Sequence, residues 1–397
     1  MDKGLLMRTS GVLLFIAYLG FISLGLPDAA HGINWPFVRS EFAVPIGWLG
    51  LVIAGGGVGY LVSSFSVGYL LSRFGVGWLL VVSSLFVSFG LFGFYFSSTF
   101  TVFVLFAIVI GIGSGAIDAG LNAYAAEHFS AKHMNWLHAA FGVGATAGPI
   151  IVTTVLVSFS QNWRLGYAIL AMILFVTAIV FLFSRHLWES DKHAPKKSEG
   201  SLDETVTVSQ LQALKHPVIR SQIVFFFLYS GVEVGVGQWA FTVMTESRGI
   251  SLASAGTWVA IYWGALAIGR AVFGFLVERF PVDQLLRLCL AGVVLGALSF
   301  TASVTPYASY LGLALMGFSA APIFPCMISQ TAIRVGKKYS AHAIGFQMSA
   351  AVTGAMTLPF LSGLIGGHYG LAWLSVTFLF YALLLFGLFQ LILKRVK

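Results

Sequence analysis

Three acidic residues stand inside long apolar stretches of this sequence: Asp28, Asp118 and Glu233. An ionised carboxylate in apolar surroundings is costly even after the protein relaxes around it. Each acid must therefore be paired, hydrated or protonated, and burial favours the protonated form. We expect these residues to act as proton carriers. A hydrogen-bonded structural acid at a helix contact is the alternative for each of them.

Asp118 occurs in the segment GIGSGAIDAGLNAYAAEHF, and Asn122 follows it by four residues. This spacing places both side chains on one face of a helix. A carboxyl and a carboxamide stacked in this way can accept a proton and bind a sugar hydroxyl. The glycines at 111, 115 and 120 predict close packing against a neighbouring helix rather than a phosphate loop, because no strand precedes them.

A second polar group, formed by Glu233, Gln238 and Trp239, occurs in FFFLYSGVEVGVGQWAFTVM. The glycines in this segment would let a helix bend or unwind, which is tolerated where the backbone lines a cavity. Glu233 and Gln238 offer hydrogen bonds to hydroxyls, and Trp239 offers an apolar face for a pyranose ring. Tryptophan is also common at the membrane interface, so both interpretations of Trp239 stay open.

The segment LGLPDAAHGINWP contains Asp28 together with His31, Asn34 and Trp35. Pro27 and Gly25 loosen the backbone where the Asp28 carboxyl would face a cavity. We therefore expect Asp28 to be a second acid behind Asp118. For His31, Asn34 and Trp35 two roles stay open, lining an extracellular entrance or a structural role at a helix end.

His138 and Arg270 are two further ionisable residues within apolar segments. His138 is either a hydrogen-bonded residue near a helix end or a proton relay, and we include it among the candidate substrate-binding residues. Arg270 could pair with an acid, bind an anionic substrate or reach the cytoplasmic interface. Because Gly274 and Glu278 follow Arg270 at four and eight residues, we favour a gating or structural ion pair.

No metal or cofactor site is expected. Glu127, His128 and His133 lie close together in the sequence, but their spacing fits no defined zinc signature. Cys289 and Cys326 both fall in apolar segments and match no metal-ligand spacing, so we interpret them as small hydrophobic residues. The only cofactor-like species we expect is the proton, as the coupling ion.

The composition is that of a polytopic α-helical membrane protein. Hydrophobic residues make up 58% of the 397 residues and charged residues only 9%, whereas soluble domains have about 25% charged residues. The net charge of +8 does not indicate nucleic-acid binding, because the basic residues are scattered between apolar stretches. The expected macromolecular environment is a lipid bilayer. The first apolar run lacks a convincing cleavage site, so we expect a retained first helix.

Apolar stretches of about 20 residues predict twelve membrane spans. Their approximate ranges are 11–35, 46–70, 77–97, 100–125, 135–158, 164–184, 220–244, 253–277, 283–303, 305–330, 340–363 and 371–393. A long polar stretch separates spans six and seven. We therefore predict an all-α fold with an N-terminal six-helix bundle at 1–184, a cytoplasmic linker at 185–219 and a C-terminal six-helix bundle at 220–397.

The distribution of Lys and Arg predicts the orientation in the membrane. Three of the 22 basic residues fall on one side of the predicted spans (Arg39, Arg164 and Arg248), Arg270 lies inside span eight, and the others lie on the opposite side. By the positive-inside rule, both termini and the central linker are cytoplasmic.

The two halves of the sequence repeat each other. VGYLLSRFG at 67–75 matches FGFLVERFP at 273–281, and GATAGP at 144–149 parallels GAMTLP at 354–359. The first pair lies at the cytoplasmic end of the second span of each half, and the second pair lies in the fifth span of each half. Two pseudo-symmetric six-helix bundles with a midplane site are the arrangement of transporters that work by alternating access.

Over its whole length the chain resembles the major facilitator superfamily. The cytoplasmic loop signature of that family is roughly G-x-L-x-D-R-x-G, in which the acid and the Arg help to hold the inward-closed gate. The first copy here keeps Arg73 but has Ser72 in place of the acid, and the second copy has Glu278 and Arg279 but ends in Pro281. The resemblance thus implies gating roles for Arg73, Glu278 and Arg279, with more weight on the second loop, and the spacing of Arg270 from Glu278 adds Arg270 to these gating candidates.

Within the superfamily, GAIDAGLNAY, NWLHAAFGVGATAGP, YSGVEVGVGQWA and GFSAAPIFP resemble the fucose, galactose and glucose proton symporter family. This resemblance implies that Asp118 and Asn122 belong to a sugar and proton site. It also implies that an acid in span one, near Asp28, contributes to this site. The YSGVE segment around Glu233 resembles the glucose permease branch, in which a Glu is likewise found. The superfamily is usually monomeric, so we expect a monomer.

The sequence therefore predicts a proton-coupled symporter of a monosaccharide-like sugar in the plasma membrane. The alternative from the same class is a proton-driven antiporter that exports drugs, lipids or other hydrophobic compounds, because buried acids serve antiport equally well. A receptor without transport would need a signalling domain, and the 35-residue central linker is too short and polar for one. An enzyme is not expected, because no combination of nucleophile, base and orienting residue can be identified.

Overall fold

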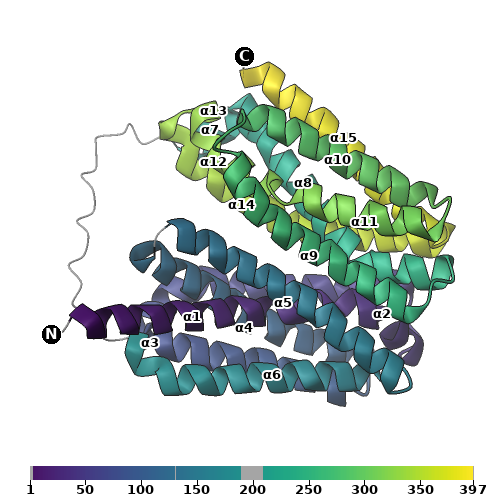
Figure 1. Cartoon of the computed structure of the whole chain (residues 1–397), viewed down its shortest axis with the longest axis horizontal. Helices are drawn as coiled ribbons and strands as arrows, with labels where there is room; N and C mark the ends of the chain where they lie inside the picture. The colour runs from purple at the N-terminus through teal and green to yellow at the C-terminus, as the bar shows by residue number, and fades with distance from the viewer. Residues whose placement is uncertain (1–2, 130, 189–208, 397) are drawn as a thin grey trace. The chain divides into compact units, whose positions relative to one another are not determined.

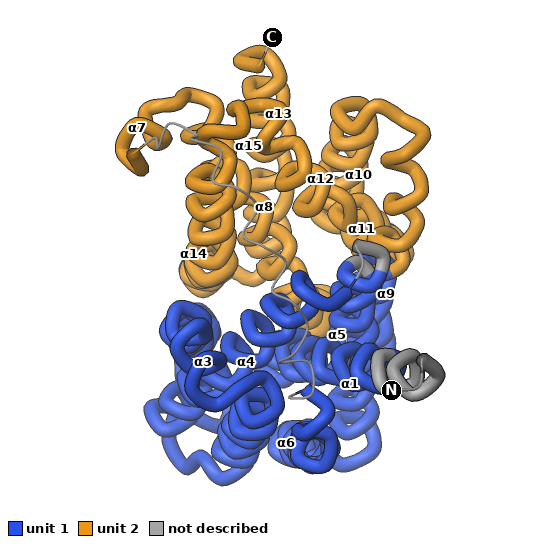
Figure 2. Tube along the Cα trace, turned by 90° about the vertical axis from the view of Figure 1, so that its left-hand side faces the viewer, with its two compact units in different colours: residues 1–194, 251–267 blue, residues 195–250, 268–397 orange. Residues whose placement is uncertain are grey.

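A computed structural model of the chain describes residues 3–129, 131–188 and 209–396 (Figure 1). The described residues form helices, turns and short connections, without strands. They divide into two compact units, one within 1–194 and 251–267 and the other within 195–250 and 268–397 (Figure 2). Most of the predicted central linker lies outside the described residues.

Unit 1 contains the first six long helices and the start of α9. Its helices are α1 (Lys3–Asp28), α2 (Ala30–Glu41), the 3-10 helix η1 (Ile46–Trp48), α3 (Leu49–Phe96), α4 (Phe100–His128), α5 (Ala131–Ser158), α6 (Trp163–Ser184) and the 3-10 helix η2 (Arg185–Trp188). The helix α9 (Leu252–Leu276) joins unit 1 through contacts with α5. Ideal Cβ atoms at Gly142 and Gly256 would lie only 2.5 and 1.9 Å from side-chain atoms of Ala267 and Thr153. This grouping differs from the predicted division at 185–219.

Unit 2 contains the rest of α9 and the helices that follow the central linker. These are α7 (Gln210–Lys215), α8 (Pro217–Thr242), the π-helix η4 (Val243–Ser247), α10 (Val282–Ala302), α11 (Pro306–Ala320), α12 (Ile323–Ser329), α13 (Thr331–Val335), α14 (Lys337–Tyr369) and α15 (Ala372–Val396). The predicted spans nine and twelve, 283–303 and 371–393, agree closely with α10 and α15.

One of the long helical stretches corresponds to two of the predicted spans. Eleven helical stretches of the described residues are long and apolar enough to span a bilayer, and one of them, Ile46–Phe96, has 51 residues. At 1.5 Å per residue a straight helix of that length would measure about 75 Å, more than twice the hydrocarbon thickness of about 30 Å. Gly75 breaks α3 with φ 74° and ψ 168°, so this stretch contains the predicted spans two and three.

Span one is interrupted at the acid that the sequence singled out. The helix α1 ends at Asp28, a turn follows at Ala29, and α2 begins at Ala30. Pro27 lies in the last turn of α1 and Pro36 lies inside α2. Since proline lacks a backbone N–H, Pro27 removes a helix hydrogen bond next to this break and favours it, whereas α2 continues through Pro36.

Glycines bring the helices of each unit into close contact. An ideal Cβ at Gly144 of α5 would lie 2.0 Å from the carbonyl oxygen of Ile22 in α1, and one at Gly354 of α14 would lie 1.9 Å from that of Phe227 in α8. Gly144 and Gly354 are equivalent positions in the repeated segments GATAGP and GAMTLP. Both halves of the sequence therefore use the same glycine contact between their first and fifth spans.

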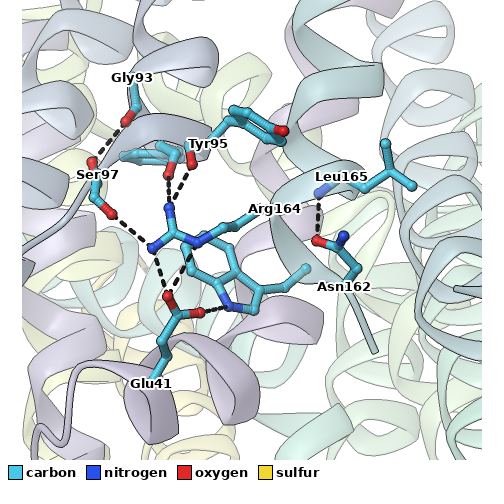
Figure 3. Close-up of polar contacts among 9 residues, drawn as sticks. Glu41, Gly93, Tyr95, Ser97, Asn162, Arg164 and Leu165 are labelled. Carbon is cyan, nitrogen blue, oxygen red and sulfur yellow. Dashed lines mark hydrogen bonds and ion pairs between the residues drawn. The ribbon is translucent and has the colours of Figure 1, made fainter. Parts of the chain in front are cut away.

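Arg164, at the start of α6, connects three helix ends on one side of unit 1 (Figure 3). Its guanidinium lies 2.6 Å from the Glu41 carboxylate at the end of α2. It also donates hydrogen bonds to the carbonyl oxygens of Tyr95 and Ser97, at and just after the end of α3. The indole of Trp163 donates to the second Glu41 oxygen at 2.7 Å. Arg164 thus satisfies carbonyls that a helix end leaves without partners.

Candidate functional site

Asp118 of α4 accepts hydrogen bonds on both carboxylate oxygens. The amide of Asn122, one turn further along the helix, donates to Oδ1 at 3.0 Å. The hydroxyl of Tyr60, from the first part of α3, donates to Oδ2. The predicted pairing of Asp118 with Asn122 is therefore present, and Tyr60 is an additional partner from another helix.

The contact between Tyr60 and Asp118 follows from the packing of α3 against α4. Gly115 precedes Asp118 by one turn, and an ideal Cβ there would lie 2.4 Å from the carbonyl oxygen of Tyr60. Gly111 packs just as closely on Gly56, with 1.9 Å from its ideal Cβ to the Gly56 oxygen. The predicted packing role of these α4 glycines is confirmed. Only glycine lets the two backbones approach so closely that the Tyr60 hydroxyl reaches the carboxylate.

Two further titratable groups interact with this site. The charge of Asp28, at the end of α1, interacts electrostatically with Asp118, and that of His138 on α5 does so as well. Asp28 and His138 are exposed, whereas Tyr60, Asp118 and Asn122 are half-buried. We call these five residues the acid cluster. It combines two carboxyls, a phenol, an imidazole and an amide from four helices of one unit, and its members are half-buried or exposed.

The other candidates from span one are packing residues in this structure. Trp35 is 1% exposed and its indole donates to the carbonyl oxygen of Ile46 at 2.9 Å. Asn34 is fully buried, and His31 lies 3.0 Å from the Tyr167 hydroxyl of α6. Of the two roles predicted for these residues, the geometry fits the structural one. Buried residues such as Asn34 and Trp35 do not line an entrance here.

In unit 2, Glu233 and Arg270 lie together. The guanidinium of Arg270 on α9 is 3.3 Å from the carboxylate of Glu233 on α8. Of the alternatives that the sequence left open for Arg270, the pairing with an intramembrane acid is the one seen. No specific partner of Glu233 was predicted from the sequence.

Trp239 is in the core of unit 2 rather than at an open surface. Its side chain is 0% exposed, and its indole donates to the carbonyl oxygen of Pro359 on α14 at 2.9 Å. The neighbouring Gln238 is also buried. The environment of Trp239 matches that of Trp35, which occupies the same position in the similar segments NWPF (34–37) and QWAF (238–241). This geometry favours packing over sugar stacking for Trp239.

No group of three or more His, Cys, Asp and Glu residues in the described part of the chain could hold a metal ion. Glu127 and His128 are exposed near the end of α4. Cys289 and Cys326 are buried free thiols in α10 and α12. These surroundings agree with the interpretation of the cysteines as small hydrophobic residues.

The sequence matches the family model described as Major Facilitator Superfamily over residues 11–351, and a second match covers residues 239–397. This chain belongs to the major facilitator superfamily. Solved structures of superfamily-like fold align with nearly the whole chain. The nucleoside transporter NupG has a TM-score of 0.74 at 14% identity, covering 98% of this chain and 99% of its own. The D-xylose-proton symporter has a TM-score of 0.70 at 18% identity, covering 94% and 96%.

Three curated relatives are each 24% identical to this chain over the aligned residues. The glucose/mannose transporter GlcP of Bacillus subtilis (strain 168) is 24% identical over 277 residues, which cover 68% of this chain and 67% of GlcP. Sodium-dependent glucose transporter 1 of Homo sapiens is 24% identical over 387 residues, covering 88% and 72%. Bypass of stop codon protein 6 of Saccharomyces cerevisiae is also 24% identical, and this chain aligns with 61% of its length.

The contacts of the residues in the two superfamily loop signatures differ from those expected of a gate. Arg73 is exposed and donates to the Tyr69 hydroxyl on its own helix at 2.8 Å. Glu278 and Arg279 are exposed as well, and neither forms an ion pair within the residues that the structure describes. The gating roles of these residues stay predictions.

The ion pair found after the second signature joins Asp283 at the start of α10 to Arg334 of α13, at 2.6 Å. Arg334 is 8% exposed and its guanidinium also contacts the Met327 sulfur. Sequence reasoning counted Arg334 only as a topology signal and missed this pair. The only feature of the sequence that pointed to this pair was a second acidic residue, Asp283, shortly after the signature segment 273–281.

Proposed function

We propose that this chain transports a monosaccharide-like sugar across a membrane in symport with protons, by alternating access. The observation that carries the proposal is the acid cluster, in which two carboxyls on membrane-spanning helices interact with each other and remain accessible. Asp118 is the principal proton acceptor and Asp28 the second. The sugar class is supported by GlcP and the sodium-dependent glucose transporters, and by the fold shared with the D-xylose-proton symporter.

Coupling follows from the cost of a charge in an apolar environment. A conformational change that closes water out of the site is unfavourable for ionised Asp118 and Asp28, since their mutual repulsion and desolvation add up. Protonation removes this cost and also provides a hydroxyl donor for a sugar oxygen. The transporter therefore changes conformation more easily when its site is loaded and protonated, or empty and neutral, than when the site is charged.

Candidate sugar contacts are proposed in each unit separately. Asn122 and His138 belong to the acid cluster, and Glu233 offers acceptors on α8. Because Gln238 is buried and Trp239 packs against Pro359, they are weaker candidates in this conformation. We place the protein as a monomer in the cell membrane with both termini in the cytoplasm.

The proposal is tested with the purified full chain in liposomes. Radiolabelled glucose, mannose and xylose are offered under an inward proton gradient, an inward sodium gradient or no gradient. Accumulation that needs the proton gradient and disappears with a protonophore is expected. The names of the sodium-dependent relatives make sodium the second candidate ion, and accumulation driven by sodium alone would overturn proton coupling.

A parallel measurement addresses the antiporter alternative. Liposomes loaded with a hydrophobic fluorescent dye are exposed to a proton gradient. Dye export, together with the absence of sugar counterflow, would overturn the symport proposal. Sugar counterflow without dye export is the result that symport requires.

A further inference from the structure

Tyr60 interacts with both carboxyls of the acid cluster. It is the residue of α3 that reaches Asp118, and it also interacts electrostatically with Asp28 on α1. The titratable groups that face Asp118 are thus Tyr60 from α3, Asp28 from α1 and His138 from α5. The Tyr60 phenol donates a hydrogen bond to the Asp118 carboxylate from another helix.

The position of Tyr60 is fixed by the backbone rather than by its side chain alone. Gly115 packs on the Tyr60 carbonyl oxygen, and the Ser64 hydroxyl on the next turn of α3 donates to the Gly115 carbonyl oxygen at 3.3 Å. These two contacts hold α3 against α4 at Gly115, one turn before Asp118. The Tyr60 hydroxyl therefore meets Asp118 as a result of helix packing.

A phenol hydroxyl has a single proton to donate. While it donates to Asp118, it stabilises the ionised carboxylate, as the Asn122 amide does on the other oxygen. When Asp118 is protonated at Oδ2, the new O–H group occupies the space into which Tyr60 donates its hydrogen bond. The Tyr60 O–H must then rotate away from Oδ2. The hydrogen bond thus opposes proton uptake and favours release.

We propose that Tyr60 is a positioning residue for the proton site, whose hydroxyl holds Asp118 in the ionised form and releases it when a proton binds. This inference rests on the proposed function for its meaning in transport. Its physical content, control of the protonation of one carboxyl by one phenol, does not depend on which sugar is carried.

The test uses Tyr60→Phe, which removes the hydroxyl and keeps the ring. The protonated Asp118 carboxyl is followed by its infrared C=O band in the lipid-reconstituted full chain as pH varies, with the band assigned by its loss in Asp118→Asn. The midpoint of this titration is expected to rise by about one pH unit, a tenfold change in proton affinity. The matched control is Tyr69→Phe, an exposed tyrosine on the same helix, which should leave the midpoint unchanged.

An unchanged midpoint in Tyr60→Phe, an equal shift in Tyr69→Phe, or the absence of a titrating Asp118 band would overturn the inference. Sugar counterflow measured on the same preparations separates this outcome from failure of the proposed function. If the midpoint shifts but the protein transports no sugar, the role of Tyr60 is supported and the symport proposal is contradicted. If the protein transports sugar but the midpoint does not shift, the symport proposal is supported and the role of Tyr60 is contradicted.

A second measurement separates positioning from a purely structural role. If Tyr60 acts through Asp118, Tyr60→Phe should shift the pH dependence of uptake in the parent protein and not change the residual exchange of Asp118→Asn. An equal loss of exchange in both backgrounds would show that Tyr60 only maintains the fold.

Discussion

The carboxylate of Glu233 and the guanidinium of Arg270 lie 3.3 Å apart between α8 and α9, with 14% and 21% of their side chains exposed. Glu233 is thus neutralised by a permanent cation, whereas Asp118 accepts hydrogen bonds from the neutral groups of Tyr60 and Asn122. Loss of either partner would leave a largely buried charge uncompensated. We therefore expect the proton to bind in unit 1 and Glu233 to act mainly through its ion pair with Arg270.

The Glu233 and Arg270 pair should behave as a coupled unit in stability measurements. Either Glu233→Gln or Arg270→Gln leaves one largely buried charge without its partner, so each should lower the melting temperature by roughly 5 °C or more. The double variant removes both charges and should recover most of that loss. Differential scanning fluorimetry of all four proteins measures this. Additive losses in the double variant would contradict the pairing.

Asp118→Asn should abolish proton-driven accumulation and preserve sugar counterflow. The substitution keeps the shape of the side chain and a hydrogen-bonding oxygen but cannot bind a proton at physiological pH. Counterflow needs only the loaded carrier to cross, whereas accumulation needs the proton to bind and leave. The comparison is made in liposomes with and without a proton gradient. Accumulation at the parent level would show that another group carries the proton.

Trp239→Phe distinguishes packing from sugar stacking. The indole is buried and donates to Pro359, so its loss should reduce thermal stability through a smaller side chain and an unsatisfied carbonyl oxygen. Sugar affinity should stay within about twofold of the parent, a free-energy change below roughly 0.5 kcal/mol. Trp35→Phe is the matched control in unit 1. A large loss of affinity in Trp239→Phe alone would restore the stacking role.

Much of the fold could be predicted because the bilayer sets simple requirements. A span needs about 20 apolar residues, and the predicted 283–303 differs from Val282–Ala302 by one residue at each end. The glycine contacts were predictable for a similar reason, since small residues at helical spacing permit close packing. These features depend on residues near each other in the sequence.

The contacts that make the site specific were not predictable in the same way. Tyr60 and Asp118 are 58 residues apart, and no pattern around Tyr60 distinguishes it from other tyrosines in apolar segments. The pair of Asp283 and Arg334 likewise depends on how short helices turn after α11. His31, Asn34 and Trp35 looked available for a ligand because their types suit one, but tertiary packing buries two of them. Residue type alone does not show which side of a helix the neighbouring helices cover.

Membrane orientation can be tested with single cysteines on exposed residues of unit 2. Lys338→Cys lies at the start of α14 and Ser247→Cys lies at the end of η4, two helix ends that the charge distribution places on opposite sides of the membrane. A membrane-impermeant maleimide added to intact cells should label Ser247→Cys and should reach Lys338→Cys only after the cells are opened. The native Cys289 and Cys326 are buried, so their background labelling should be low. The opposite labelling pattern would invert the topology.

The glycine contact between the first and fifth spans of each half gives the last prediction. Gly144→Ala and Gly354→Ala would place a methyl group about 2 Å from a backbone oxygen of Ile22 or Phe227, which only a shift of the helices can relieve. Each should cost about 1–3 kcal/mol of stability. Gly274→Ala is the matched control, because no atom lies within 4 Å of its ideal Cβ. Since alanine favours a helix over glycine, this control should be neutral or slightly stabilising. Equal melting temperatures for all three variants would contradict the shared packing role.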